Sequence, residues 1–142
     1  MELLGIAGRR CSVFFTEQVL TELSDWGSAK EPKTAMVSLM TKSVPDHGPP
    51  FGTPACTPMG DGLFEFRKGR HRGPKVRVLW FYGDNTESVV VCVRAFVKTF
   101  PKTPPEEIAA AKAARVLYTN AAQNKTLRIE DGSDLLRKKG PR

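Results

Sequence analysis

Six cations and no carboxylate lie between Arg67 and Arg77, on a segment that the sequence predicts to be a β-hairpin. The six are Arg67, Lys68, Arg70, Arg72, Lys75 and Arg77, and His71 lies among them. No Asp or Glu occurs between Phe66 and Gly83. Because like charges confined to one hairpin repel one another, we expect an anionic partner to compensate them, and a phosphate backbone is the first candidate.

Three of the basic residues fall on successive predicted strands. Arg67 lies on a strand over 63–68, Arg77 on one over 75–82, and Lys98 at the end of one over 88–98. If these strands pair as a meander, the three side chains can meet on one face, where cations would stabilise charge that builds on phosphate oxygens. Arginine also gives bidentate phosphate contacts that lysine cannot. The alternative is a solvated sheet face with three ordinary cations.

Glu65 is the one acid embedded among the strand cations. It could form a salt bridge with Arg67 or Arg77, or it could transfer a proton or orient an arginine during a reaction. His71 could accept a proton if its loop is ordered, although a lone loop histidine more often has no chemical role.

The other basic residues of this region suit contacts to a phosphate backbone, which position a nucleic acid without reading its sequence. Tyr82, at a strand end, is the aromatic residue best placed to stack on a base, whereas Trp80 and Phe81 are expected to contribute to the core. The expected RNA-binding residues are Lys68, Arg70, His71, Arg72, Lys75, Tyr82, Arg94 and Lys102.

The chain has 142 residues, enough for one domain with a modest core, and a net charge of +7. This charge favours an acidic partner, with nucleic acid ahead of an acidic protein and an anionic membrane surface. Three scattered cysteines argue against a zinc site or a disulfide framework and favour a reducing cytoplasm. Without a secretory signal or a long apolar run, we expect no membrane span, and we also expect no metal or cofactor.

Periodicity and capping residues predict the elements that position these groups. We expect a loose extension over 1–10, a single domain over 11–123 and a basic tail over 124–142. Within the domain we expect a strand over 11–15, helices over 16–26 and 28–43, a Pro/Gly-rich loop over 45–62, strands over 63–68, 75–82 and 88–98, and a helix over 103–122. Thr103 and Glu106 have capping-box spacing for the last helix, with Pro104 at its first position.

This order predicts an α+β domain whose helices cover mostly one side of the sheet. In the strand over 88–98, strict alternation assigns every residue to one of two faces. One face would carry Val89, Val91, Val93, Ala95 and Val97, and the other Val90, Cys92, Arg94, Phe96 and Lys98.

Four segments in order resemble the HigB/RelE superfamily of type II toxins, and most closely its phage-derived HigB-like branch. They are GLFEFR at 62–67, RVLW at 77–80, FVK at 96–98, and the Thr-Pro-rich segment with the Ala/Lys helix after it. The resemblance is strong from Gly62 to Lys112 and weak before Pro54. It implies the RelE-like fold, a small twisted and mostly antiparallel sheet with two N-terminal helices and a C-terminal helix.

The resemblance also implies a cytoplasmic endoribonuclease that cleaves messenger RNA, usually in the ribosomal A site. In such enzymes the ribose 2′-OH attacks the adjacent phosphate and no metal ion is needed. Matched motif by motif, the implied catalytic residues are Glu65, Arg67, Arg77 and Lys98, with Arg77 as the transition-state cation. The implied partner is an acidic antitoxin with a helix-turn-helix DNA-binding domain, which would cover the basic face.

Two positions depart from the HigB-like pattern. Arg94 stands where many members have a histidine, which removes a natural base, and Thr99 stands where they have a second lysine. Glu65 or His71 could take over as base. The alternative function is a non-enzymatic, phage- or prophage-derived protein that binds a host protein or nucleic acid through its basic face.

Overall fold

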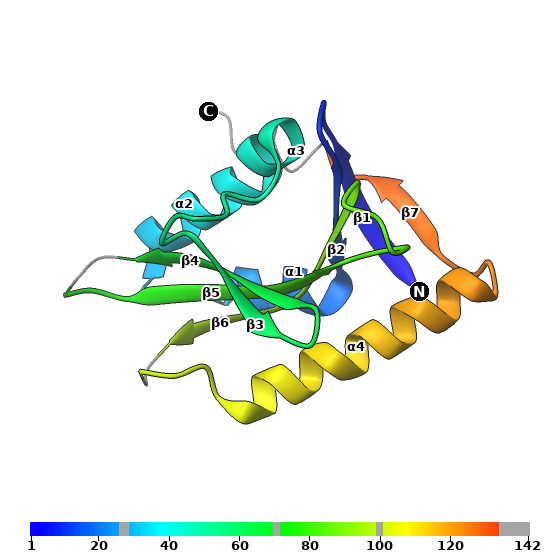
Figure 1. Cartoon of the computed structure of the whole chain (residues 1–142). Coiled ribbons are helices and arrows are strands. Elements are labelled where there is room, and N and C mark those ends of the chain that lie inside the picture. Colours follow the sequence, from blue (N-terminus) through cyan, green and yellow to red (C-terminus); the bar gives the residue numbers. More distant parts are fainter. Residues whose placement is uncertain (26–28, 70–71, 99–100, 134–142) are drawn as a thin grey trace.

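A seven-stranded mixed sheet forms the centre of the part of the chain that the computed structural model describes, residues 1–25, 29–69, 72–98 and 101–133 (Figure 1). The strand order is β3-β4-β5-β6-β2-β1-β7. The strands are β1 Glu2–Ala7, β2 Ser12–Thr16, β3 Cys56–Gly60, β4 Leu63–Gly69, β5 Lys75–Tyr82, β6 Val89–Lys98 and β7 Arg128–Asp131. The helices are α1 Glu17–Ser24, α2 Lys30–Ser38, the π-helical turn η2 Leu39–Ser43, α3 Val44–His47 and α4 Pro105–Gln123.

The expectation of a small, mostly antiparallel sheet with two N-terminal helices is wrong. Strands β3 to β6 do form an antiparallel meander, but β6 pairs with β2 in parallel and β1 pairs with β7 in parallel. The first two elements of the chain are strands, and they form an antiparallel hairpin before the first helix begins. The sheet is therefore larger than expected and mixed.

The neighbouring strands β1 and β7, at one edge of this enlarged sheet, come from segments expected to be loosely ordered. Leu3 and Ile6 of β1 are buried, so residues 2–7 belong to the core rather than to an extension. The β7 backbone joins β1 through a hydrogen bond from Arg128 N to the Met1 carbonyl at 2.9 Å. All four β7 side chains are exposed, which is why the sequence pattern gave no sign of this strand.

Helices cover both sides of the sheet, not mostly one side as expected. We call the side under α4 the α4 face and the opposite side, under α1, α2 and η2, the α2 face (Figure 1). The α4-face core contains Leu3, Leu63, Leu79, Phe81, Val91, Val93, Ala111 and Tyr118. The larger α2-face core includes Val13, Phe15, Val19, Met36, Met40, Phe66, Val78 and Trp80.

A β-bulge in β6 overturns the expected strict alternation. Leu79 pairs with Arg94 and Trp80 pairs with Cys92, so Val93 has no residue opposite it. Before the bulge, Val90 and Cys92 pack in the α2-face core; after it, Ala95 does. The bulge therefore moves Arg94 and Lys98 to the α4 face, away from Val90 and Cys92.

The cap predictions had mixed outcomes. Thr16 caps α1 as predicted, since its Oγ1 accepts a hydrogen bond from Val19 N at 3.2 Å. The predicted boundary between the first two helices, at Trp26 to Ser28, lies outside the described residues. The predicted capping box of α4 is wrong, because Pro104 is the N-cap and no side chain caps the helix. The Thr103 hydroxyl turns to the sheet instead.

The Pro/Gly-rich segment over 45–62 is not entirely loop, because it holds most of α3 and the whole of β3. Gly48 ends α3 with a left-handed φ of 80°, which glycine adopts without steric cost. Phe51 follows in the remaining loop and packs on Phe64 and Trp80 of the α2 face. None of the described helices is long and apolar enough to cross a membrane.

Truncating Ile6 tests whether β1 is part of the core. Ile6→Ala removes a side chain that is 4% exposed and should lower the free energy of unfolding by about 2–4 kcal/mol. Ile129→Ala on β7 is the matched control, because Ile129 is 49% exposed, and its cost should stay below about 1 kcal/mol. Urea denaturation measures both. Equal small losses would mean that residues 1–10 are a loose extension after all.

Candidate anion-binding site on the α4 face

A buried carboxylate lies at the centre of the site. Glu65 on β4 is 0% exposed, and its Oε1 accepts a hydrogen bond from Arg67 Nε at 2.8 Å. Its Oε2 accepts one from the Thr103 hydroxyl at 2.5 Å. Arg77 Nε is 3.5 Å from Oε1, within ion-pair distance but without a hydrogen bond of its own. The predicted salt bridge of Glu65 is therefore present, and it reaches both arginines.

Arg77 is the more deeply held of the two arginines. Only 9% of its side chain is exposed, against 33% for Arg67. Arg77 Nη1 donates to the carbonyls of Val76 at 2.9 Å and Lys68 at 3.4 Å. Burial lowers the pKa of Arg77, and Arg67 lowers it further, while the Glu65 carboxylate acts in the opposite direction. Arginine still remains a cation under ordinary conditions, so the site holds a fixed positive charge.

Pairing of the strands gathers further cations beside this group. Arg67 lies directly opposite Arg77, and Lys75 lies directly opposite Lys98. Burial lowers the pKa of Lys98, and Arg77 is the next largest cause. Lys75 and Lys98 are half-buried. The predicted convergence of Arg67, Arg77 and Lys98 on one face is confirmed, with Lys75 beside them.

Arg94 shares this face but is held by two carboxylates. Its Nη2 is 3.1 Å from Glu22 Oε2 on α1 and 2.8 Å from Glu107 Oε1 on α4. Arg94 Nε also donates to Glu107 at 2.8 Å. A guanidinium tied to two helices in this way joins them to β6 and has little positive charge left to offer a ligand.

The other expected RNA-binding residues are scattered. Lys68 follows Phe66 by two residues on β4 and therefore shares its face, the α2 face, where it lies beside Pro32 and Ala35. Tyr82 also lies there, with its ring against Phe64 and Trp80, and burial raises its pKa to about 12. Two basic residues remain near the site.

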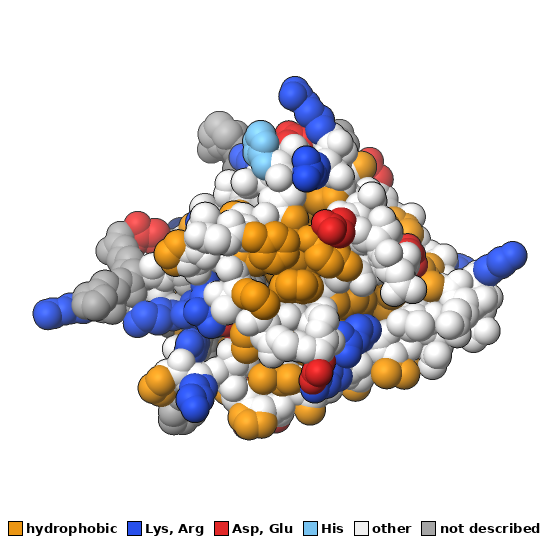
Figure 2. All heavy atoms as spheres, in the orientation of Figure 1, with side chains coloured by type: hydrophobic (Ala, Val, Ile, Leu, Met, Phe, Trp, Pro, Cys, Tyr) orange, Lys and Arg blue, Asp and Glu red, His pale blue; other side chains and the backbone are white. Residues whose placement is uncertain are grey.

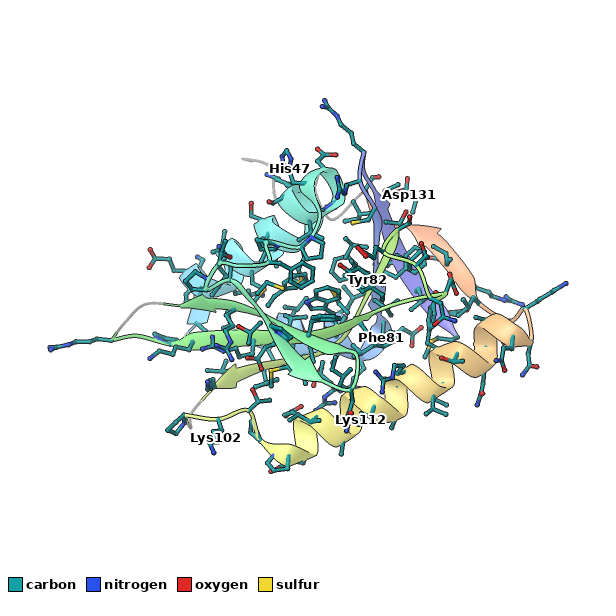
Figure 3. The ribbon with its side chains drawn as sticks, viewed as in Figure 1. His47, Phe81, Tyr82, Lys102, Lys112 and Asp131 are labelled. Atoms are coloured by element: carbon teal, nitrogen blue, oxygen red, sulfur yellow. The ribbon has the colours of Figure 1, made fainter. Side chains whose placement is uncertain are left out.

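Those two residues lie at its rim. Arg72 is exposed in the β4–β5 connection, and Lys102 is exposed just before α4. Figure 3 shows Lys102 beside the start of α4, whereas Tyr82 points toward α2 and α3. Arg70 and His71 lie outside the described residues. In Figure 2, Lys and Arg side chains gather over the ends of β4, β5 and β6, while hydrophobic side chains occupy the middle of the view.

Two residues of the site were not predicted. The sequence predicts that Thr103 caps α4, but its hydroxyl instead donates to the buried Glu65 carboxylate. Phe96 was assigned to a face with Val90 and Cys92, but the bulge places it half-buried on the α4 face, opposite Arg77. The sequence pattern indicates neither placement. That of Thr103 depends on the path of the chain between β6 and α4, and that of Phe96 depends on the unpaired residue Val93.

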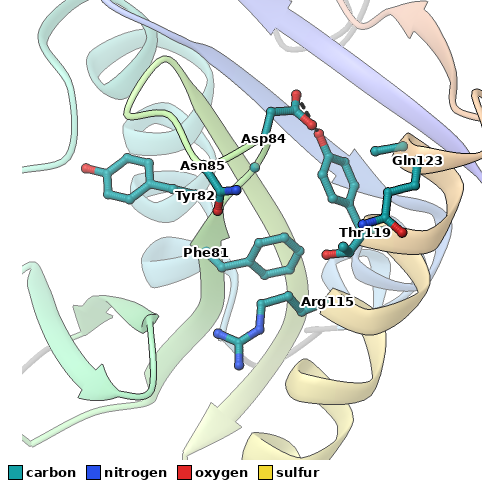
Figure 4. Close-up of a pocket in the computed structure, with 10 residues that line it drawn as sticks. Phe81, Tyr82, Asp84, Asn85, Arg115, Thr119 and Gln123 are labelled. Carbon is teal, nitrogen blue, oxygen red and sulfur yellow. Dashed lines mark hydrogen bonds between the residues drawn. The ribbon is translucent and has the colours of Figure 1, made fainter.

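A separate pocket lies between the β5–β6 turn and α4 (Figure 4). It has a volume of about 330 Å³ and is lined by Phe81, Asp84, Arg115 and Thr119, among others. The Tyr118 hydroxyl donates to Asp84 Oδ2 at 3.2 Å across its wall. Of the predicted site residues that the structure describes, only Tyr82 lines this pocket, so the pocket and the cation cluster are distinct. Within the described part of the chain, no three His, Cys, Asp or Glu side chains are grouped to hold a metal ion.

Fold and site together define a small α+β protein with a strongly cationic sheet face organised around one buried carboxylate. Residues 28–116 match the family model described as phage derived protein Gp49-like (DUF891), which covers more than half of the chain. The chain therefore belongs to this phage-derived family, which is toxin-like in general character. No curated protein matches the chain.

Removing the Thr103 hydroxyl tests its contact with Glu65. Thr103→Val keeps the shape but leaves a buried carboxylate oxygen without this donor, so the free energy of unfolding should fall by about 1–3 kcal/mol. Thr103→Ser should retain most of the stability. Urea denaturation followed by tryptophan fluorescence measures both.

Thr41→Val is the matched control for this comparison. Thr41 is equally buried, but its hydroxyl donates to the Val37 carbonyl within a helical segment, at 2.7 Å. Its loss should cost less than about 1 kcal/mol. If Thr41→Val and Thr103→Val were equally destabilised, the Glu65 contact would have no special weight.

Proposed function

We propose that this chain is the toxin of a type II toxin–antitoxin system, of the HigB-like branch, and that it cuts messenger RNA on the ribosome. The observation that supports this most is the Glu65 group. One buried carboxylate holds two arginines that lie opposite each other on neighbouring strands, and one of the two reaches solvent. Membership of a phage-derived, toxin-like family is consistent with the proposal.

The arginines suit the charge that such a reaction creates. When the ribose 2′-oxygen attacks phosphorus, a new O–P bond forms, the bond to the 5′-oxygen breaks, and a 2′,3′-cyclic phosphate and a 5′-hydroxyl result. Negative charge rises on the phosphate oxygens before the leaving group departs. Arg67 and Arg77 can donate hydrogen bonds to those oxygens in a fixed geometry, so the proposed reaction needs no metal ion. Lys98 adds positive charge beside them.

Glu65 fits orientation of the arginines better than proton transfer. Its two oxygens are already occupied by Arg67 and Thr103, and it is fully buried. Under the proposal, the 2′-hydroxyl proton passes to water or to another side chain, and the 5′-oxygen takes up a proton in return. His71 stays a prediction for this role, since it lies outside the described residues.

The proposed partner is an acidic antitoxin with a helix-turn-helix DNA-binding domain. The chain carries a net charge of +7, and one group of its cations lies at one end of the sheet. An acidic segment lying over this face would neutralise it and would block access of RNA to Arg67.

A second function has one observation in its favour. Arg94 is locked between Glu22 and Glu107, and Glu65 is enclosed, so the described residues of the site offer no open base. A phage-derived protein that binds nucleic acid or a host protein without cutting would need the cations and no base. Cleavage of RNA separates the two functions.

Expression in a bacterial host with primer extension on a reporter message tests the proposal. Wild type should arrest growth and create new 5′ ends. Arg67→Gln and Arg77→Lys should reduce cleavage by about 100-fold or more, because the planar arginine fork is lost. Arg77→Lys is preferred to Arg77→Ala, since removing the buried cation would leave Arg67 as the one cation paired with buried Glu65 and could unfold the domain.

Lys112→Met is the matched control for lost charge. Lys112 lies on α4 (Figure 3), where its ammonium pairs with the exposed Asp61 at 2.8 Å instead of with Glu65. It should leave both arrest and cleavage unchanged. Growth arrest without new 5′ ends would favour the second function, binding without cleavage. Full cleavage by the arginine variants would show that Arg67 and Arg77 are not catalytic.

A further inference from the structure

The cations of the α4 face form two rows across the strands. We define the arginine row as Arg67 and Arg77 and the lysine row as Lys75 and Lys98, because the members of each row are directly opposite in register. The rows are two residues apart along β5, so their side chains point to the same face. Phe96, two residues before Lys98, ends the arginine row with an apolar ring.

We propose that this face binds two successive phosphates of one RNA strand, the reacting phosphate at the arginine row and its neighbour at the lysine row. The inference rests on the proposed function and specifies the substrate contacts of the same site. Two residues of extended strand span about 7 Å, which is comparable with the step between neighbouring phosphates in a single strand. Single-stranded RNA is sufficient for this binding, since each row contacts only one phosphate of the same strand.

The track has a closed end and an open end. A third row would contain Glu65, Leu79 and Arg94, which follow the same register. Glu65 is an anion, Leu79 is buried, and Arg94 is held by carboxylates on α1 and α4. This row would repel or exclude a phosphate. The track therefore stops at the arginine row, and the neighbouring phosphate must lie toward the ends of β5 and β6.

Exposure follows the same direction. Glu65 is fully buried and Arg77 is nearly so, whereas Arg67 and, at the strand ends, Lys75 and Lys98 are half-buried. Such a gradient suits a strand that enters from the open end and places its reacting phosphate deepest, against the arginines that Glu65 and Thr103 hold.

Repulsion within the rows gives the second phosphate a driving force. Like charges directly opposite each other on neighbouring strands destabilise a sheet. Arg77, Arg67 and Lys75 all lower the pKa of Lys98, after burial, and Glu65 is the one carboxylate that opposes them. A second phosphate at the lysine row would place an anion beside Lys98 and so weaken this repulsion.

Dinucleotides with one or two phosphates test the proposal without a ribosome or a known cutting site. The probes are UpA, pUpA and UpAp, each with a 2′-O-methyl group on the first ribose, which prevents attack by that oxygen. Affinity is measured by NMR titration of the full chain, with the arginine side-chain signals reporting where the probe binds. One of the two added phosphates should tighten binding to wild type by about fivefold, the effect of one partly exposed charge pair.

The variant Lys98→Met identifies the second contact. It should bind UpA somewhat more weakly than wild type, because Lys98 lies beside the arginine row, and it should also lose most of the gain from the added phosphate. Lys112→Met removes the same charge from α4, where Lys112 faces Asp61, and should keep the full gain. Backbone amide spectra of both variants should match wild type away from the substituted residue, which excludes unfolding as the cause.

The outcomes separate this inference from the function on which it rests. If UpA shifts the Arg67 and Arg77 signals but neither added phosphate improves binding, the arginine row stands and the two-phosphate track is wrong. An equal gain in Lys98→Met and wild type would likewise overturn it. If UpA leaves the arginine signals unchanged, both the track and the proposed RNA site fail together.

Discussion

A single carboxylate without access to water organises the functional end of this protein. Glu65 is charged and fully buried, and a buried charge is tolerated only when it is paired and hydrogen-bonded. Its partners come from β4, from β5 and from Thr103, two residues before α4. Satisfying one carboxylate therefore fixes two strands and the start of a helix relative to one another, and the same contacts fix the direction of both arginine side chains.

The chemistry of the meander could be read from the sequence, because it depends on local alternation. Glu65, Arg67 and Arg77 alternate with aromatic and β-branched residues that must face a core, so their shared face follows once the strands pair in order. Arg94 could not be placed in the same way. Its face depends on the extra residue Val93, and its charge is compensated by Glu22, which is remote in sequence.

The full extent of the sheet could not be predicted from the sequence, for a different reason. β1 is short and ends before two arginines, and β7 has no buried side chain, so neither shows the pattern of a strand. They pair with each other in parallel although β1 begins at Glu2 and β7 at Arg128. The family match over 28–116 covers the meander, the Glu65 group and most of α4, but it leaves out β1, β2, α1 and β7. Three of the seven strands thus lie outside the part that carries the family resemblance.

The bulge in β6 lies where this strand loses its neighbour β2. β6 pairs with β2 only as far as Cys92, so its backbone beyond that point could recruit a strand from another molecule. The amide of Ala95 instead donates to Glu22 Oε1 at 3.0 Å, and α1 packs along this part of β6. A helix side chain thereby takes the place of a neighbouring strand. Glu22 therefore blocks strand addition at Ala95 and also pairs with Arg94, so one acidic residue both covers an open stretch of sheet edge and holds an arginine of the cation cluster.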